Sequence, residues 1–538
     1  MFDPGWAAEG HTERVIALFQ AWVEAQAIPG LSFEVVREEG RTPLLFLELA
    51  AAGGGGGGTV LMYGHLDKQP PMAAAWAEGL HPYEPVVRDG KLYGRGGADD
   101  GYALFGAVTA LGALRAQGAA HGRAVIIIEA CEESGSPDLP QYVLALRARI
   151  GTPTLIVCLD SGCGNYEQMW LTTNLRGLVG GNLRTTILKE AVHSGSSSGV
   201  VPSSFRITRQ LLSRIEDEAT GRVLLPELHC AIPPDRVREA AAVAKIMGKS
   251  VYTNFPWVEG AAPSGAEDLA ELLLRRTWRP ALSVTGAEGF PTLAQAGNVL
   301  RTSTALKLSM RLPPRCAAEP AGLALKAALE ASPPHGAHVV FELEKSAAGW
   351  DAPASAPWLS AAVEAASLAA FGAPPAYFGE GGSIPFMGML GELFPQAQFV
   401  VTGVLGPGSW VQAGRARAAR DRCHRARARA RGTAPAPQLT ARRPAPSALP
   451  APRPHRNAHG PNEFLHIGFT KKIIAAVGVI LAAHAQQPAA TAGEAAAAAG
   501  AMEARTLAAN ADRHATLQVH AAKHAAKGAH EHMEGCCP

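Results

Sequence analysis

Charged side chains follow three short apolar runs of the chain. They are His65 and Asp67 after residues 59–64, Glu132 and Glu133 after 124–130, and Asp160 after 154–159. A further acidic pair, Asp99 and Asp100, lies in GRGGADDG just before a helical pattern. Neighbouring carboxylates at the ends of buried segments repel each other and lose solvation, so this pattern indicates that a cation balances them.

The apolar runs that precede these side chains are rich in Val, Ile and Leu, which is typical of buried parallel strands. We expect four such strands, at residues 59–64, 124–130, 154–159 and 398–405. Helical patterns separate the first three, and residues 100–117 form the clearest one. The sequence therefore predicts an α/β fold with a mixed, largely parallel sheet flanked by helices. Ligands bind beyond the carboxyl ends of such strands, so the histidine and the acids should share one edge of the sheet.

One imidazole with several carboxylates suits zinc or manganese better than calcium, which takes oxygen ligands. The number of acids predicts two divalent metal ions, and zinc is favoured over manganese. Three carboxylate ligands and a hydroxide would balance the charge of the two ions. In such sites the ions lie about 3.5–4 Å apart and share a bridging group.

The ordered set GHLD, GRGGADDG, EACEESGS and CLDSG resembles the co-catalytic zinc peptidase family of carnosinase, cytosolic non-specific dipeptidase, aminoacylase and glutamate carboxypeptidase. The dipeptidase subgroup is the most similar. The resemblance covers nearly all of residues 10–485 apart from 410–456. It implies a phosphorylase/hydrolase-like catalytic domain, an inserted lid that also dimerises, and a homodimer. It also implies hydrolysis of a dipeptide or a related short amide with a free carboxylate.

The resemblance assigns roles to single residues. The implied metal ligands are His65, Asp99, Glu133, Asp160 and His459, the last from NAHGPNE at residues 457–463. Asp99 is implied to bridge both ions, and the Asp99–Asp100 peptide to be cis. Asp67 would orient the His65 ring, Glu132 would be the general base, and Glu463 would have a structural role.

The resemblance also implies a substrate-binding set. His193, in AVHSGSSSG, resembles a histidine that crosses a dimer interface to stabilise the oxyanion, a role that is both catalytic and substrate-binding. Arg311, in LSMRLPP, resembles an arginine that binds the substrate carboxylate. Gly382 and Ser383, in GEGGSIP, would hold the same end of the substrate in a glycine-rich turn.

Changes in composition along the chain predict its domains. The predicted parts are catalytic segments at 1–181, 348–409 and 457–486, an α+β lid and dimerisation domain at 182–347, an Arg/Pro-rich insertion at 410–456, and an Ala-rich tail at 487–538. In the lid we expect strands with more alternation at 304–313 and 338–346 and a helix within 203–218.

The segment 410–456 holds twelve arginines and one acidic residue, Asp421. It lacks apolar periodicity and is expected to be disordered. Its composition also fits translated non-coding sequence. Closing a loop of this length costs little free energy, so His459 could still reach the metals. If the segment disrupts the site, the chain would instead be an inactive scaffold or a basic binding protein. A third alternative is an N-acyl amino acid amidohydrolase.

Other sequence features indicate which binding partners and which cellular compartment to expect. The arginine-rich segment has no aromatic residue beyond Trp410, so we expect no specific nucleic-acid binding. The eight cysteines form no C-x-x-C pair, which favours reduced thiols. We expect no signal peptide and no membrane span, since no run of about twenty uncharged apolar residues occurs. The predicted location is therefore cytoplasmic.

Overall fold

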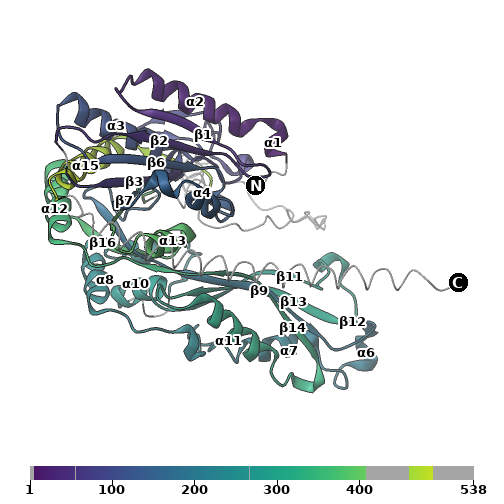
Figure 1. Cartoon of the computed structure of the whole chain (residues 1–538). Coiled ribbons are helices and arrows are strands. Elements are labelled where there is room, and N and C mark those ends of the chain that lie inside the picture. Colours follow the sequence, from purple (N-terminus) through teal and green to yellow (C-terminus); the bar gives the residue numbers. More distant parts are fainter. Residues whose placement is uncertain (1–4, 55, 264, 266, 408–459, 489–538) are drawn as a thin grey trace, which may run out of the picture.

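The computed structural model describes residues 5–54, 56–263, 265, 267–407 and 460–488 of the chain. The predicted insertion 410–456, the predicted ligand His459 and nearly all of the predicted tail 487–538 lie outside the described residues. Figure 1 shows the described chain as two lobes, one built around a largely parallel sheet and the other around an antiparallel sheet.

The first lobe holds a six-stranded sheet of order β1-β2-β6-β3-β7-β17. Its parallel strands are β3 (Thr59–His65), β6 (Arg123–Glu129), β7 (Pro153–Cys158) and β17 (Gln398–Val401). Two antiparallel strands, β1 (Ser32–Val36) and β2 (Leu44–Leu49), complete one edge. The predicted fold class is confirmed, although β17 ends at Val401 rather than at residue 405.

Both faces of this sheet are buried, because successive side chains of a strand point to opposite faces. On β3, Val60 and Met62 join the core on one face. Leu61 and Tyr63 join the core on the other face. Helices α3 (Tyr102–Ala116), α12 (Pro357–Phe371) and α15 (Ile467–Ala485) contribute to the first core, and α4 (Leu139–Ala145) and α13 (Pro385–Leu393) to the second.

Helix α15 is long and apolar enough, by length and composition alone, to cross a membrane. It is the one such helix in the part of the chain that the structure describes. Its side chains Ile473, Val477 and Ile480 are buried in the same core as α3 and α12, and it packs against both helices. The apolar character of α15 is therefore explained by its place in the core of this lobe.

The second lobe holds a four-stranded antiparallel sheet of order β11-β13-β9-β14. The strands are β9 (Gly177–Thr186), β11 (Ala281–Glu288), β13 (Ser303–Leu312) and β14 (His338–Ala347). Helices α7 (Ser204–Leu212) and α11 (Ala318–Glu330) pack on this sheet and share its core. Strand β9 begins at Gly177 and runs through residue 182, the predicted start of the lid domain. The domain boundaries stay a prediction.

A small sheet joins the two lobes. It contains β8 (Trp170–Leu175), β15 (Trp350–Asp351) and β16 (Ala376–Glu380). Only Arg176 separates β8 from β9, so the chain passes directly from this sheet into the second lobe. Any residue at this junction therefore lies between the two lobes.

The remaining elements are short or peripheral. The strands are β4 (Val86–Arg88), β5 (Lys91–Tyr93), β10 (Val192–His193), β12 (Val299–Leu300) and β18 (Phe464–His466). The helices are α1 (Trp6–Glu9), α2 (His11–Ala25), α5 (Arg147–Ile150), α6 (Ser194–Ser197), α8 (Pro234–Met247), α9 (Ser250–Thr253) and α10 (Leu269–Thr277). The single turns are η1 (Ala73–Ala75), η2 (Gly97–Gly101), η3 (Glu132–Ser134), η4 (Pro226–Leu228), η5 (Leu293–Gln295) and η6 (Pro334–Gly336).

Candidate metal centre

His65 is the last residue of β3, and its side chain is fully buried. Its Nδ1 lies 3.1 Å from the backbone oxygen of Asp67 and 3.4 Å from the Asp67 Oδ1. Its Nε2 lies 3.2 Å from the Asp99 Oδ1 and 3.8 Å from the Asp160 Oδ2. Because Asp67 engages Nδ1, the Nε2 atom is left to face the other carboxylates, which is the usual arrangement of a ligating histidine.

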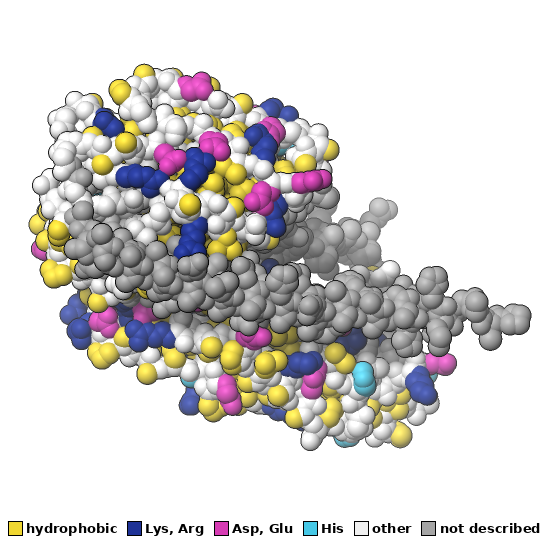
Figure 2. Space-filling view, viewed as in Figure 1, with side chains coloured by type: hydrophobic (Ala, Val, Ile, Leu, Met, Phe, Trp, Pro, Cys, Tyr) yellow, Lys and Arg dark blue, Asp and Glu magenta, His cyan; other side chains and the backbone are white. Residues whose placement is uncertain are grey.

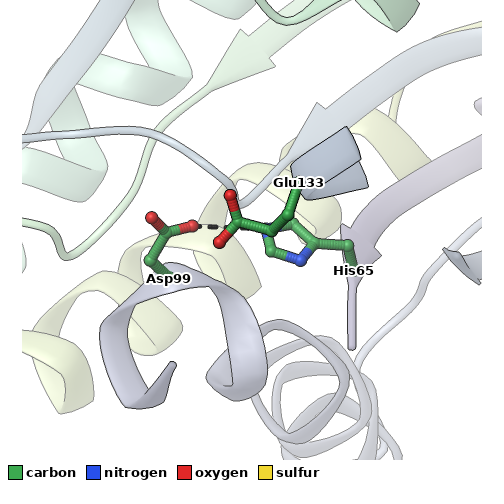
Figure 3. A group of neighbouring side chains, drawn as sticks. All are labelled: His65, Asp99 and Glu133. Carbon is green, nitrogen blue, oxygen red and sulfur yellow. Dashed lines mark hydrogen bonds and ion pairs between the residues drawn. The ribbon is translucent and has the colours of Figure 1, made fainter. Parts of the chain in front are cut away.

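Two groups of potential ligand atoms share His65. In one, His65, Asp99 and Glu133 offer atoms within 4.8 Å of one another. In the other, His65, Asp100 and Asp160 do so. Figure 3 shows the side chains of the first group converging, with a dashed line between His65 and Asp99. The strand ends and η2 thus bring together four of the five ligands predicted from the sequence, and η2 adds Asp100, which the motifs did not assign as a ligand.

Asp67 also fixes the turn that carries the two glutamates. Its Oδ1 accepts a hydrogen bond from the backbone N–H of Glu132 at 3.0 Å. Its Oδ2 accepts one from the backbone N–H of Glu133 at 3.1 Å. One carboxylate therefore locks the orientation of the His65 ring and the start of η3 together.

A close approach of backbone segments brings Asp100 to the end of β3. The Asp99–Asp100 peptide is cis, and the Asp100 Oδ2 accepts a hydrogen bond from the backbone N–H of His65 at 3.2 Å. A Cβ at Gly64 would lie 2.6 Å from this Oδ2 and would clash with the Cβ of Ala103. Only glycine allows the turn η2 to pack so tightly on β3.

Glu463, from NAHGPNE, holds the same turn from the other side. Its buried carboxylate accepts hydrogen bonds from the Nη1 of Arg95 at 2.8 Å and from the backbone N–H of Asp99 at 3.3 Å. It also accepts from the N–H groups of Gly96 and Ala98 at 3.0 and 3.2 Å. This bonding gives Glu463 the structural position that the motif indicated, four residues after His459.

The electrostatics of the cluster call for a positive charge. Burial and the carboxylate of Asp160 raise the pKa values of Asp100 and Glu132 well above their ordinary range. Burial alone lowers the pKa of His65, but the surrounding acids, Asp160 first, raise it well above its usual value. The protein thus concentrates negative charge around one imidazole nitrogen. This nitrogen-and-oxygen donor set fits divalent transition metal ions.

A second charged site lies where the two lobes meet. The Nη1 of Arg311, on β13, donates a hydrogen bond to the Oγ of Ser383 at 3.0 Å. The Ser383 hydroxyl donates in turn to the backbone oxygen of Arg176 at 2.5 Å. The Nε of Arg176 donates to the oxygen of Gly381 at 3.0 Å, and its N–H donates to the oxygen of Gly382 at 3.1 Å. We call this set the arginine turn.

Arg176 was not identified from the sequence. Burial, together with the charges of Arg311 and Arg276, lowers its pKa to about 9. Its one available signal was an arginine directly after a buried strand, in TTNLRG, where a charge without a partner is unfavourable. Crowded buried cations at a glycine-rich turn are an arrangement that binds anions.

Residues 61–485 match the sequence profile of the peptidase family M20/M25/M40. The chain belongs to this family. The resemblance drawn from its motifs is therefore confirmed.

Relatives of this M20 peptidase agree with that placement. Beta-Ala-His dipeptidase of Mus musculus is 29% identical over 277 residues, which cover 51% of this chain and 54% of that protein. Cysteinylglycine-S-conjugate dipeptidase of Corynebacterium striatum is 28% identical over 361 residues, which cover 65% of this chain and 74% of that protein. The chain thus matches about half the length of the mouse relative.

A solved structure shows the same fold. The crystal structure of human carnosine dipeptidase 1 matches with a TM-score of 0.60 at 20% identity, over 88% of this chain and 92% of that chain. At this level of identity, the likeness establishes the two-lobed architecture of the M20 peptidase and nothing finer.

His193 of the M20 peptidase lies away from the cluster. It is exposed, and its Nδ1 accepts a hydrogen bond from the N–H of Gly195 at 3.2 Å. Figure 1 shows α6 and β12, its neighbours, at the end of the antiparallel sheet far from β3 and β6. Within a single chain, therefore, the structure does not bring His193 to the candidate metal ligands.

Proposed function

We propose that this chain is a metal-dependent hydrolase that cleaves the peptide bond of dipeptides or related short amides with a free carboxylate. The relatives named above are dipeptidases whose names give different substrates, which supports a short peptide but no particular side chain. The observation that carries the proposal is the sharing of His65 between two groups of carboxylates.

The proposed ligands are His65, Asp99, Asp100, Glu133, Asp160 and His459. Two divalent ions held there, with zinc favoured over manganese, would supply polarisation of an amide carbonyl and a lowered pKa for water. Support for His459 comes from Glu463, which follows it by four residues and hydrogen-bonds the Asp99 turn.

Glu132 is the proposed general base. It stands next to Glu133 in η3, and burial with the charge of Asp160 raises its pKa, so it can accept a proton and later return it to a leaving amine. Asp67 keeps Glu132 in place through the backbone of η3. A residue with these two properties is suited to carrying a proton between the two stages of hydrolysis.

The arginine turn is the proposed binding site for the substrate carboxylate. Arg311 and Ser383 already bond to each other, and Gly382 keeps the backbone of the turn accessible. A carboxylate bound between them would receive charge-assisted hydrogen bonds. This contact would select substrates whose scissile bond lies close to a free carboxyl end.

We further propose that the protein is a cytoplasmic homodimer. The five described cysteines, at positions 131, 158, 163, 230 and 316, are free thiols, as expected in a reducing compartment. His193 is exposed at the far end of the second lobe, where it is available to a second copy of the chain. Sedimentation of the purified chain tests the dimer, and a monomer at working concentration would contradict it.

The function is tested on the purified full chain by counting bound metal and assaying hydrolysis. We expect bound divalent metal, turnover of dipeptides, and loss of turnover on chelation with recovery on adding zinc or manganese. Turnover of N-acetyl amino acids alone would favour the amidohydrolase alternative. If the chain neither binds metal nor hydrolyses dipeptides when zinc or manganese is added, the proposed function is wrong for this chain.

A matched chain without residues 410–456 separates the fold from the insertion. If the full chain is inactive and the shortened chain binds metal and hydrolyses dipeptides, the proposed site is correct and the insertion blocks it. If both chains are inactive and bind no metal, the proposed site is wrong.

A further inference from the structure

A cavity of about 530 Å³ opens beside the arginine turn, on the helices α9 and α10 and the segment between them. Its walls are mostly apolar and include Tyr252, Phe255, Trp257 and Leu272, and its one charged lining residue is Arg276. The volume falls in the range of small-molecule sites, about 300–1,000 Å³. None of these residues belongs to the candidate metal centre.

The aromatic side chains of this cavity are partly exposed to solvent. The side chains of Phe255 and Trp257 are 45% and 44% exposed. Their rings lie edge to face with centroids 6.5 Å apart, and the Nε1 of Trp257 donates a hydrogen bond to the oxygen of Tyr252 at 2.7 Å. Two exposed rings held in a fixed arrangement form a surface suited to an apolar or aromatic ligand group.

Arg276 is the charged residue of the cavity, and the buried carboxylate of Glu380 is near enough to act on its charge. It projects from the last turn of α10, and its Nε is buried without a hydrogen-bond partner. Its guanidinium forms no hydrogen bond or ion pair with any residue that the structure describes. Burial raises the pKa of the neighbouring Glu380, although Arg276 acts against that rise. An unpaired buried donor is unfavourable, and a carboxylate is the ligand that satisfies it best.

Arg276 also connects the cavity to the arginine turn. A Cβ at Gly381 would lie 3.1 Å from the Cγ of Arg276 and 3.2 Å from the Nη2 of Arg176. The stem of Arg276 therefore packs against the turn that carries Ser383. A ligand that reorients Arg276 would act directly on that turn.

We propose that this cavity binds small carboxylates that carry an aromatic or branched apolar group. Phe255 and Trp257 contact the apolar group, and Arg276 pairs with the carboxylate. The proposed occupant is an acid separate from the substrate, because the arginine turn is proposed to receive the carboxylate of the substrate.

Calorimetric titration of the full chain with 3-phenylpropionate tests the proposal. Phe255→Ala and Arg276→Met should each weaken binding of 3-phenylpropionate by about tenfold or more. This is the effect expected for loss of one apolar side chain that the ligand covers, or of one charged contact with the ligand. The neutral 3-phenylpropionamide should bind more weakly than the acid. Phe290→Ala is the matched control, because Phe290 is 42% exposed and lies outside the cavity; it should bind like the parent chain.

Several outcomes would overturn this site. The site is wrong if 3-phenylpropionate does not bind, or if Phe290→Ala weakens its binding as much as Phe255→Ala does. It is also wrong if Arg311→Met abolishes binding of the acid while Arg276→Met leaves binding unchanged. The last would place the acid in the arginine turn. Arg276 also lies near buried Glu380, so thermal melts accompany each variant. Phe255→Ala changes neither of these two residues and keeps the test decisive.

Hydrolysis then tests whether the occupant is separate from the substrate, and this arm rests on the proposed function. If Phe255→Ala raises the KM for a dipeptide ending in Phe but not for one ending in Gly, the cavity receives a substrate residue and the proposal of a separate acid is overturned. If neither KM changes while binding of 3-phenylpropionate is weakened, the cavity takes a separate acid. The titration itself needs no turnover, so failure of the proposed function leaves the binding result interpretable.

Discussion

The candidate metal centre and the arginine turn are assembled in different ways. His65 ends β3, and Glu133 and Asp160 follow the neighbouring parallel strands β6 and β7. The pairing of these strands, in which His65 lies opposite Glu129, sets the relative height of the three residues. The arginine turn instead joins Arg311 of β13 to Ser383, which precedes α13, through residues of the junction between the lobes. The first site inherits its geometry from one sheet, whereas the second depends on how two lobes are held together.

This difference predicts different consequences of substitution. Changes in the metal centre should act on metal binding and on the chemical step, since the sheet stays in place. Changes in the arginine turn should act mainly on substrate binding. If variants of the metal centre and of the arginine turn change kcat and KM in the same way, the proposed division of roles between the two sites is wrong.

The largest effect is expected for Glu132→Gln. Removing a positioned general base should lower kcat by about 10²–10⁴-fold, while the amount of bound metal stays unchanged. Steady-state kinetics with metal analysis checks this, and Glu39→Gln, at an exposed position in the same lobe, is the control. Near-normal turnover in Glu132→Gln would remove Glu132 from the base role.

Asp67→Asn should have the second largest effect, a loss of metal affinity, because Asp67 contacts both the His65 ring and the backbone of η3. Loss of a residue that orients a metal ligand typically lowers metal affinity by about 10–100-fold. Titration of the metal-stripped chain with zinc measures this directly. Unchanged affinity would mean that Asp67 does not orient His65 in the working protein.

Arg311→Met should raise KM for a dipeptide by about 10–100-fold with a smaller change in kcat, because a charged hydrogen bond contributes about 1.5–3 kcal/mol. Arg311→Lys should recover only part of the affinity, since lysine lacks the planar fork of donors. The metal content of both variants should match that of the parent chain. A fall in kcat alone would argue that Arg311 serves the chemical step instead.

Ser383→Ala should have the smallest effect, a rise in KM of about fivefold, as expected for one neutral hydrogen bond of about 1 kcal/mol. Because Ser383 and Arg311 are in contact, the double variant should lose less affinity than the two single changes predict together. Strict additivity in this cycle would show that the two side chains bind substrate independently.

Much of the fold and of the metal centre follows from local patterns. The runs at 59–64 and 124–130 are almost entirely nonpolar, with Thr59 and Glu129 as the exceptions, and show no regular polar alternation, which predicts strands buried on both faces. Strand ends meet at one edge of a parallel sheet, so His65 and the acids could be grouped before any contact was known. The family motifs then predicted roles other than metal ligation for Asp67 and Glu132.

Other features could not be predicted in this way. Arg176 follows an ordinary strand, and its bonds to Gly381 and Gly382 join residues more than two hundred positions apart. Asp100 resembles its neighbour Asp99 in the sequence, and only the close packing of η2 on Gly64 turns it toward His65. The cavity of Phe255 and Trp257 has no periodic signal, because these two residues lie in the segment between helices α9 and α10.

The sequence by itself determined the type of sheet, the family, and the set of side chains that gather at the strand ends, since alternation, apolar runs and turn residues are local properties. The tertiary structure decided which nitrogen of His65 faces the acids, which arginines share one turn, and where an unpaired guanidinium meets an apolar cavity. These depend on distances between segments far apart in the chain, and packing of the two lobes is what sets those distances.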